Sequence, residues 1–207
     1  MPPARLSPRR FTLFKSALFA LCLVPAFAAA FAVFSDSPPP DPADYLTFQS
    51  GEQTLRFLVI TLAMTPLRLL TGWHSPLKLR RMFGLFAFFY AACHFSVYLF
   101  LDLALNWAHV WEDIVERKFI TVGFAALLLL IPLAATSNAF SIKRLGAKAW
   151  TNLHRAVYPI CILGAVHFLW IKRAKDIGEP LAYLAIMCAL LAMRLPAAQH
   201  WIKRRRA

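Results

Sequence analysis

The ten acidic residues of this chain all fall in alternate gaps between long apolar runs. They are Asp36, Asp41, Asp44, Glu52, Asp102, Glu112, Asp113, Glu116, Asp176 and Glu179. The remaining gaps and both termini hold seventeen of the 23 lysines and arginines. Positive charge concentrates in this way on the cytoplasmic side of a chain that crosses a membrane several times. The pattern therefore determines which ends of the apolar runs lie together.

The apolar runs have about the length that a bilayer requires. A helix needs about 17–25 residues to cross the hydrocarbon layer, and 59% of this chain is hydrophobic, against ~45–50% in soluble domains. Because lipid offers no partner for backbone polar groups, we expect each run to be helical. The sequence thus predicts an all-α membrane protein, a six-transmembrane helix bundle. The six runs are Ser16–Phe34, Thr54–Leu70, Met82–Leu103, Phe119–Ala135, His154–Ile171 and Pro180–Leu195.

The charge division also predicts the orientation and the domain boundaries. We expect a basic cytoplasmic N-terminus at 1–15, one membrane domain at 16–195 and a basic cytoplasmic tail at 196–207. The first run resembles a secretory signal, but its apolar core exceeds the ~7–15 residues typical of one, which favours its retention. The net charge of +13 belongs mainly to the cytoplasmic face, so it indicates contact with anionic membrane lipids and not with nucleic acid.

Six histidines are present, and two of them lie deep inside apolar runs. His94 is thirteen residues beyond Arg81, and His167 is twelve beyond Arg155, so both lie about 18–20 Å along their helices. Two imidazoles at one depth on parallel helices can bind the two faces of a haem iron. Gly164, one turn before His167, would let a porphyrin edge approach the helix. The alternative is that each histidine only hydrogen-bonds a neighbouring helix as part of the packing.

A third histidine, His154, lies thirteen residues before His167 and about 20 Å closer to the cytoplasm. That spacing suits a second haem, so we expect one or two. On a straight helix the two side chains would be roughly 140° apart, and Pro159 between them could supply the necessary bend. A ligand for the opposite face of a haem at His154 is missing, because His74, the candidate on the same side of the membrane, lies in a loop. His109 and His200 lie in a connection and in the tail.

Any haem here is expected to be held without covalent bonds. The chain contains no Cys-x-x-Cys-His sequence, the signal for c-type attachment. A non-covalent haem held by histidines would be of the b type. The sequence also lacks a Gly-x-Gly-x-x-Gly nucleotide fingerprint, so electrons must come from another molecule.

The connections carry three further predictions. The proline-rich stretch 35–50 is expected to be an extended loop. Residues 106–118 have the spacing of a short amphipathic helix on the outer surface, which could contact a periplasmic partner. Gly146 is a candidate hinge before the fifth run.

Several of these segments together resemble the MsrQ family, whose members are haem-binding membrane subunits of the ferric-reductase-like transmembrane group. The resemblance extends from Gly51 onward. It is carried by Lys143–Tyr158, by Thr65–Arg68, by Arg80–Leu85, by Thr136–Ser137 and by the histidines His94 and His167.

This resemblance implies a multi-pass b-type cytochrome of the bacterial inner membrane. Such a protein takes electrons from the quinone pool or a cytoplasmic flavin reductase. It passes them to a periplasmic molybdopterin reductase that repairs methionine sulfoxide in oxidised periplasmic proteins. It also implies that His94, His154 and His167 are the haem-iron ligands, that FMN is a further cofactor, and that the chain is an electron-transfer subunit without a catalytic site of its own.

Two other classes of protein remain as alternatives. The first is a small transporter, which usually carries charged residues or broken helices near the midplane; no Asp, Glu, Lys or Arg lies clearly at mid-span here. The second is a haem-free assembly protein whose histidines only pack. It would be colourless when purified.

Overall fold

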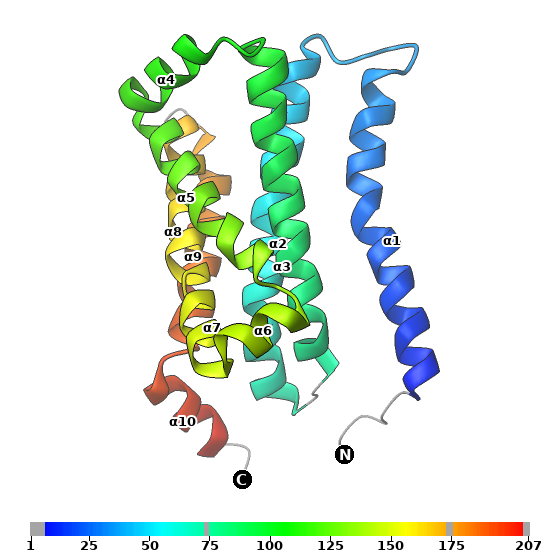
Figure 1. Ribbon diagram of the computed structural model, residues 1–207, viewed down its shortest axis with the longest axis vertical. Helices are drawn as coiled ribbons and strands as arrows, with labels where there is room; N and C mark the ends of the chain where they lie inside the picture. Colours follow the sequence, from blue (N-terminus) through cyan, green and yellow to red (C-terminus); the bar gives the residue numbers. More distant parts are fainter. Residues whose placement is uncertain (1–6, 73–74, 173–175, 205–207) are drawn as a thin grey trace.

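The computed structural model describes residues 7–72, 75–172 and 176–204, and these residues form a helical bundle (Figure 1). Five helical segments are long and apolar enough to cross a membrane, and a sixth apolar helix, α9, is shorter. The elements are α1 (Pro8–Val33), α2 (Pro42–Thr71), α3 (Ser75–Val97), the π-helix η1 (Tyr98–Asp102), α4 (Trp107–Glu116), α5 (Lys118–Ala135), α6 (Ala139–Leu145), α7 (Ala147–His154), α8 (Val157–Ile171), α9 (Gly178–Ala192) and α10 (Pro196–Arg204). The prediction of an all-helical, multi-pass membrane protein is confirmed.

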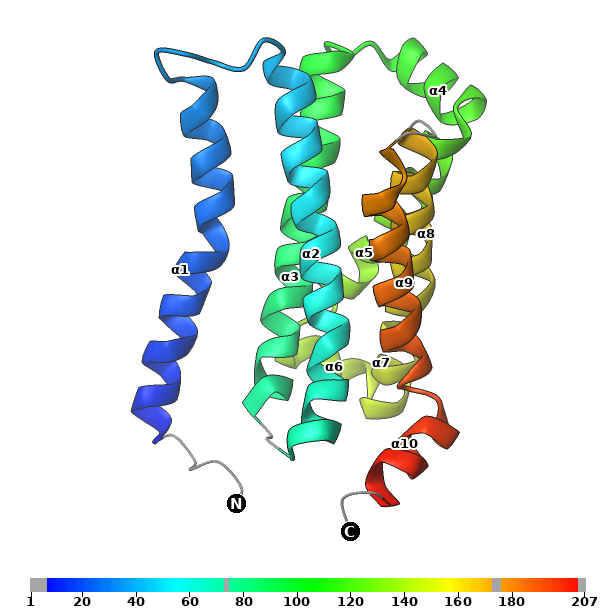
Figure 2. The same ribbon diagram turned by 180° about the vertical axis from the view of Figure 1, so that it is seen from behind.

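The two ends of the bundle differ in charge. Helix α4 and the connections after α1 and α8 lie at one end of the bundle. We call this the acidic end, because all ten carboxylates belong to α4, to these connections or to nearby helix turns. Helices α6, α7 and α10 lie at the other, the basic end (Figures 1 and 2). The start of α1 is also at the basic end, and α9 runs beside α8, as the six-run pattern requires.

The core is built between two helix pairs. Helices α2 and α3 pack along their whole lengths, α5 packs against α8, and α9 closes the bundle against α8 and α2. Phe57 of α2 stacks on Phe86 and Tyr90 of α3, with ring centroids 5.4 Å apart in both cases. On the α8 and α9 side, Ile160 and Met187 are fully buried. Large apolar side chains such as those of Phe31 and Phe34 are exposed on the outer surface of the bundle, where membrane lipid would contact them.

Helix α1 lies at the edge of the bundle (Figure 2), where Phe19 packs on Phe86 with ring centroids 5.0 Å apart and Tyr90 reaches the backbone of α1. The hydroxyl of Tyr90, a residue only 2% exposed, donates to the carbonyl of Cys22 at 2.7 Å and accepts from the amide of Ala26 at 3.2 Å. It thus bridges a backbone donor and acceptor four residues apart, beside Pro25, which lacks an amide hydrogen. This contact makes α1 a member of the bundle.

The prediction of an extended loop over 35–50 is wrong for its second half. Helix α2 begins at Pro42, with the Asp41 carboxylate accepting from the amide of Asp44 at 3.0 Å. An acidic N-cap followed by proline at the first helical position is a strong helix start, because the missing amide would have no partner there anyway. The added turns extend α2 toward the acidic end and bring the Thr47 carbonyl next to His94.

At the basic end the chain turns through two short helices before α8. Gly146 has φ 77° and ψ 154°, which a residue with a Cβ rarely adopts, so the glycine forms the turn between α6 and α7 at the position predicted for a hinge. A break at Arg155 and Ala156 separates α7 from α8. Proline at 159 cannot donate to the carbonyl of Arg155, which instead accepts from Tyr158 at 3.0 Å. The predicted bend between His154 and His167 is therefore present.

Candidate functional site

His94 and His167 face each other across the interior of the bundle. Their ring centroids are 6.0 Å apart and their planes are nearly perpendicular, at 88°. His94 lies near the end of α3 and His167 near the end of α8, so both are closer to the acidic end than to the basic end. The structure thus brings together the two residues whose depths match along the sequence.

Each of these rings is held by a backbone carbonyl of a neighbouring helix. The Nδ1 atom of His94 lies 2.9 Å from the carbonyl oxygen of Thr47, and Nδ1 of His167 lies 2.6 Å from that of Phe119. A carbonyl oxygen can only accept, so Nδ1 must carry the hydrogen in both rings. Nε2 then has the free lone pair, which is the form of imidazole that binds a metal.

Two glycines make this close approach possible. A Cβ atom on Gly123 of α5 would lie 2.6 Å from Nδ1 of His167, and one on Gly51 of α2 would lie 3.0 Å from Nδ1 of His94. The sequence analysis missed both glycines and both anchoring carbonyls. The missed signal is that these glycines occupy helical positions, where glycine is unfavourable unless another group must come close.

A cavity of about 930 Å³ surrounds the two histidines. This volume is near the upper end of the roughly 300–1,000 Å³ found for sites of small molecules and cofactors. Its walls come from α2, α3, α4, α5 and α8, and Gly164 lies in the wall, packed against Leu55. The wall away from the acidic end is apolar and includes Leu58, Leu127, Leu130 and Ile160.

The donor set fits a haem better than a bare metal ion. Within the described part of the chain, no group of three or more His, Cys, Asp and Glu side chains is placed to hold a metal. An imidazole nitrogen binds a transition metal at about 2 Å, so two imidazoles on one iron have ring centres roughly 6 Å apart. The observed separation of 6.0 Å agrees with that value. A haem held between His94 and His167 would fit both the histidine pair and the cavity.

His154 has a different environment at the basic end. Its ring stacks on Trp150, with centroids 3.8 Å apart, and its Nδ1 lies 3.0 Å from the Trp150 carbonyl oxygen. Its Nε2 lies 3.4 Å from the Ser137 hydroxyl. No second histidine among the described residues faces it. His74, the partner considered from the sequence, is outside the described residues.

The two other histidines occupy exposed positions. His109 lies on α4 at the rim of the cavity, and His200 lies on α10 at the basic end. The structure does not bring either one to the facing pair.

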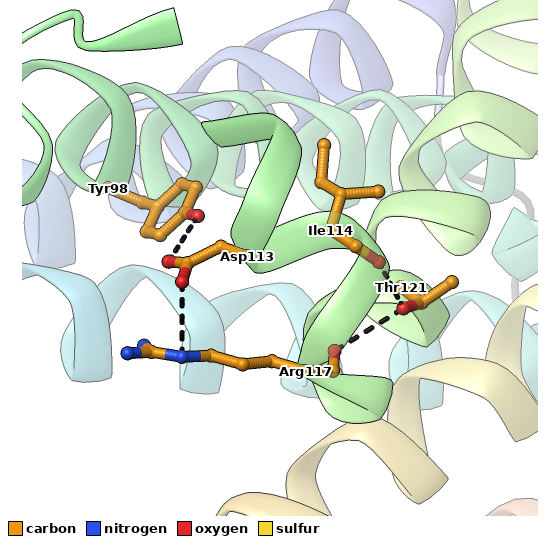
Figure 3. Close-up of polar contacts among 5 residues, drawn as sticks. All are labelled: Tyr98, Asp113, Ile114, Arg117 and Thr121. Atoms are coloured by element: carbon orange, nitrogen blue, oxygen red, sulfur yellow. Dashed lines mark hydrogen bonds and ion pairs between the residues drawn. The ribbon is translucent and has the colours of Figure 1, made fainter. Parts of the chain in front are cut away.

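A short polar network fixes α4 over the acidic end (Figure 3). The Tyr98 hydroxyl of η1 donates to Oδ2 of Asp113 at 2.9 Å, and Nε of Arg117 lies 3.1 Å from Oδ1 of the same carboxylate. The Thr121 hydroxyl of α5 donates to the carbonyls of Ile114 and Arg117. The predicted amphipathic helix is therefore present and is tied to both η1 and α5. It forms part of the cavity rim.

Comparison with known proteins agrees with this fold. A family model described as "Ferric reductase like transmembrane component" matches residues 50–165, a segment that contains His94 and His154 and ends two residues before His167. The helical bundle and this match define the class of the molecule: a multi-pass membrane protein of the ferric reductase-like transmembrane group.

Curated relatives narrow the class. The chain is 45% identical to a protein of Herminiimonas arsenicoxydans over 96% of this chain and 90% of the relative. It is 46% identical to one of Rhodospirillum rubrum over 92% and 90%, and 43% identical to one of Bordetella pertussis over 100% and 99%. All three relatives are described as "Protein-methionine-sulfoxide reductase heme-binding subunit MsrQ". The chain belongs to the MsrQ family.

Proposed function

We propose that this chain is a membrane b-type cytochrome in which His94 and His167 bind one haem from opposite faces. The observation that carries the proposal is the facing pair itself, with ring centroids 6.0 Å apart inside a cavity of about 930 Å³. The relatives' description as haem-binding subunits supports the same cofactor. When bound, haem supplies a reversible one-electron carrier whose potential depends on its axial ligands and on its burial.

The chain's own residues perform three tasks at this centre. The carbonyls of Thr47 and Phe119 hold Nδ1–H of the two rings, which keeps each Nε2 as an acceptor and fixes the ring orientation. Gly51 and Gly123 leave room for the rings. The apolar wall excludes water, and a low-dielectric environment strengthens the influence of each nearby charge on the centre.

The direction of electron transfer follows from the two unlike ends. We place the basic end in the cytoplasm, with both termini there, and the acidic end in the periplasm of a bacterial inner membrane. His154, about 20 Å along the helix from His167, would bind a second haem near the basic end. The electrons would come from the quinone pool or a cytoplasmic flavin reductase, with FMN as a further cofactor.

The acceptor would be a separate periplasmic reductase. The relatives' description names a protein-methionine-sulfoxide reductase system, and a subunit without its own catalytic site needs a partner to reduce the substrate. We propose a periplasmic molybdopterin subunit that docks at the acidic end and repairs oxidised periplasmic proteins. The cavity lies close to that end, so an electron on the deep haem is near the docking face.

An absorption spectrum with a pyridine haemochrome assay tests the proposal. The protein purified from cells supplied with haem precursor should be red, and after reduction it should show the α and β bands of low-spin b-type haem. His94→Ala and His167→Ala should each abolish the deep centre. His200→Ala, which changes an exposed histidine on α10, is the matched control and should leave the spectrum unchanged. A wild-type protein that stays colourless when reconstituted with excess haem would contradict the proposal and favour a haem-free transporter or assembly protein.

A further inference from the structure

The cavity around the two histidines is polar at one end only. Every charged residue that lines it belongs to the acidic end, and the opposite wall is made of apolar side chains such as those of Leu58, Leu130 and Ile160. A haem carries two propionates on one edge and apolar substituents on the others. Burying an unpaired carboxylate against an apolar wall is strongly unfavourable. The propionate edge must therefore point toward the acidic end.

Carboxylates outnumber cations among the charged residues at this end of the cavity, so a propionate needs a specific countercharge. Arg117 is one of the two lysine or arginine residues that line the cavity within the described part of the chain, and it already pairs with Asp113, whose other oxygen accepts from Tyr98 (Figure 3). Glu52, a half-buried carboxylate of the lining, pairs with Arg56. Arg117 is therefore committed to a protein partner.

Lys172, the other cation of the lining, has no such partner. Its Nζ lies over the rings of Phe48 and Phe168, 4.8 and 5.8 Å from their centroids, and it forms no ion pair with any residue in the described parts of the chain. The side chain is half-buried, whereas the unpaired carboxylates of the rim, such as Asp102 and Glu112, are exposed and screened by water. An ammonium group has three donors, and ring faces satisfy them only weakly.

The position of Lys172 relates it to both histidines. Phe48 follows Thr47, whose carbonyl holds His94, and Phe168 follows His167. The two phenylalanine rings are 6.5 Å apart and bring α2 and α8 together at the cavity mouth. The ammonium group over these rings thus belongs to the acidic end of the cavity that both imidazoles line, on the side where the propionate edge must be.

We propose that Lys172 binds a haem propionate and raises the reduction potential of the deep centre. This proposal rests on the proposed function, because it requires a haem between His94 and His167. Lys172 is a positioning residue: it does not bind the iron, and it orients the pigment by a charge-assisted hydrogen bond to its edge. A positive charge at this position also favours the form that carries one more electron.

The test uses the full-length chain in detergent, freed of haem and reconstituted either with protohaem IX or with its dimethyl ester, which lacks the propionate charges. The variants are Lys172→Met, Lys172→Arg and, as the matched control, Lys118→Met, which removes an exposed lysine at the same end of the bundle. The apparent dissociation constant and the midpoint potential are measured for each combination. The ferric absorption spectrum reports whether both imidazoles remain bound.

With protohaem, Lys172→Met should weaken binding roughly tenfold, the expected loss for one hydrogen bond to a charged group, and should lower the midpoint potential. Lys172→Arg should restore both. With the dimethyl ester, wild type and Lys172→Met should bind with the same affinity, because no propionate charge is left to pair with, and Lys118→Met should match wild type throughout. An equal loss of affinity for the two pigments in Lys172→Met would overturn the proposal, as would an unchanged affinity for protohaem. If the wild-type chain binds neither pigment, the proposed function itself fails, and this proposal fails with it.

Discussion

The two histidine sites of this bundle differ in how much of a metal centre each one contains. At the acidic end, His94 and His167 face each other, each ring is fixed by a carbonyl of another helix, and glycines make room for both. At the basic end, His154 stands alone among the described residues, stacked on Trp150 and close to Ser137. Each Nδ1 is bound to a carbonyl, but among the described residues only the acidic end has two imidazoles in contact with each other.

If haem binds as proposed, the described bundle supplies both ligands of the deep centre, whereas a centre at His154 would need one more ligand. The anchor of His154 comes from Trp150 on the same short helix, α7, whereas the deep rings are anchored by other helices. A ring held across helices keeps its orientation only when the whole bundle is assembled. Haem binding at the proposed deep site would therefore be linked to bundle packing, whereas binding at His154 would depend mainly on α6 and α7.

Among the substitutions that separate the two histidine sites, Gly123→Ala should have the largest effect on haem affinity at the deep centre. The added Cβ would lie 2.6 Å from Nδ1 of His167, so the imidazole must move away from the Phe119 carbonyl. We expect haem affinity of the deep centre to fall by about 10–100-fold, the usual loss when a second-shell partner of a metal ligand is removed. Haem titration of the apoprotein measures this, and Gly84→Ala, whose Cβ would make an ordinary 3.8 Å contact, is the control. Equal affinities for Gly123→Ala and Gly84→Ala would contradict the prediction.

A smaller effect is expected for Gly51→Ala. Its Cβ would lie 3.0 Å from Nδ1 of His94, so the ring needs to move by only a few tenths of an ångström. The affinity should fall less than in Gly123→Ala, while the absorption spectrum stays low-spin. The same titration ranks the two variants. A larger loss for Gly51→Ala would show that the His94 side of the cavity is the more rigid one.

The next prediction concerns the basic end and the stability of the bundle. The Cβ that Gly146→Ala adds meets no neighbouring atom, but the backbone at this position has φ 77°. Holding alanine in that conformation should lower the stability of the fold by about 1–3 kcal/mol. Thermal unfolding in detergent should show a lower midpoint, and the deep centre's spectrum should not change. Gly178→Ala, which also meets no neighbour but lacks the positive φ, is the matched control. If both variants unfold at the wild-type temperature, the strain argument is wrong.

The smallest effect on the deep centre should come from His154→Ala. The substitution removes the ring stacked on Trp150, and it leaves the carbonyls of Thr47 and Phe119 and both deep rings in place. A spectroelectrochemical titration should show the deep centre with unchanged bands and midpoint potential. Ser137→Ala, which removes the 3.4 Å contact to Nε2 together with the hydroxyl's 2.7 Å hydrogen bond to the Leu133 carbonyl but keeps the imidazole, serves as the control. Loss of the deep centre in His154→Ala would mean that the three histidines serve one haem.

The sequence predicted the parts of this structure that depend on periodicity and charge. Hydropathy placed the apolar helices, the division of charge placed the two ends, and the residue spacing from Arg81 and Arg155 paired His94 with His167. It also located the bend near Pro159 and the hinge at Gly146. Each of these features depends on local or one-dimensional information, which a single sequence contains.

The contacts around the histidines could not be predicted in this way. Thr47 acts through its carbonyl oxygen, a group that every residue has, so its side chain gives no signal. The start of α2 at Pro42 was missed because consecutive prolines at 38–40 suggested an extended segment, although Asp41 and Pro42 form a helix start. The roles of Gly51 and Gly123 depend on which helix packs opposite them, and this is a three-dimensional property.

The central claim is that His94 and His167 bind one iron from its two faces. Near-infrared magnetic circular dichroism of the ferric protein tests it most directly, because the charge-transfer band of a low-spin haem identifies both axial ligands. The measurement uses His154→Ala, so that only the deep centre contributes, and compares it with the same protein carrying His167→Met. The account predicts a bis-imidazole band in the first protein and an imidazole–thioether band in the second. A high-spin spectrum in the first protein, or a bis-imidazole band that persists in the second, would contradict it.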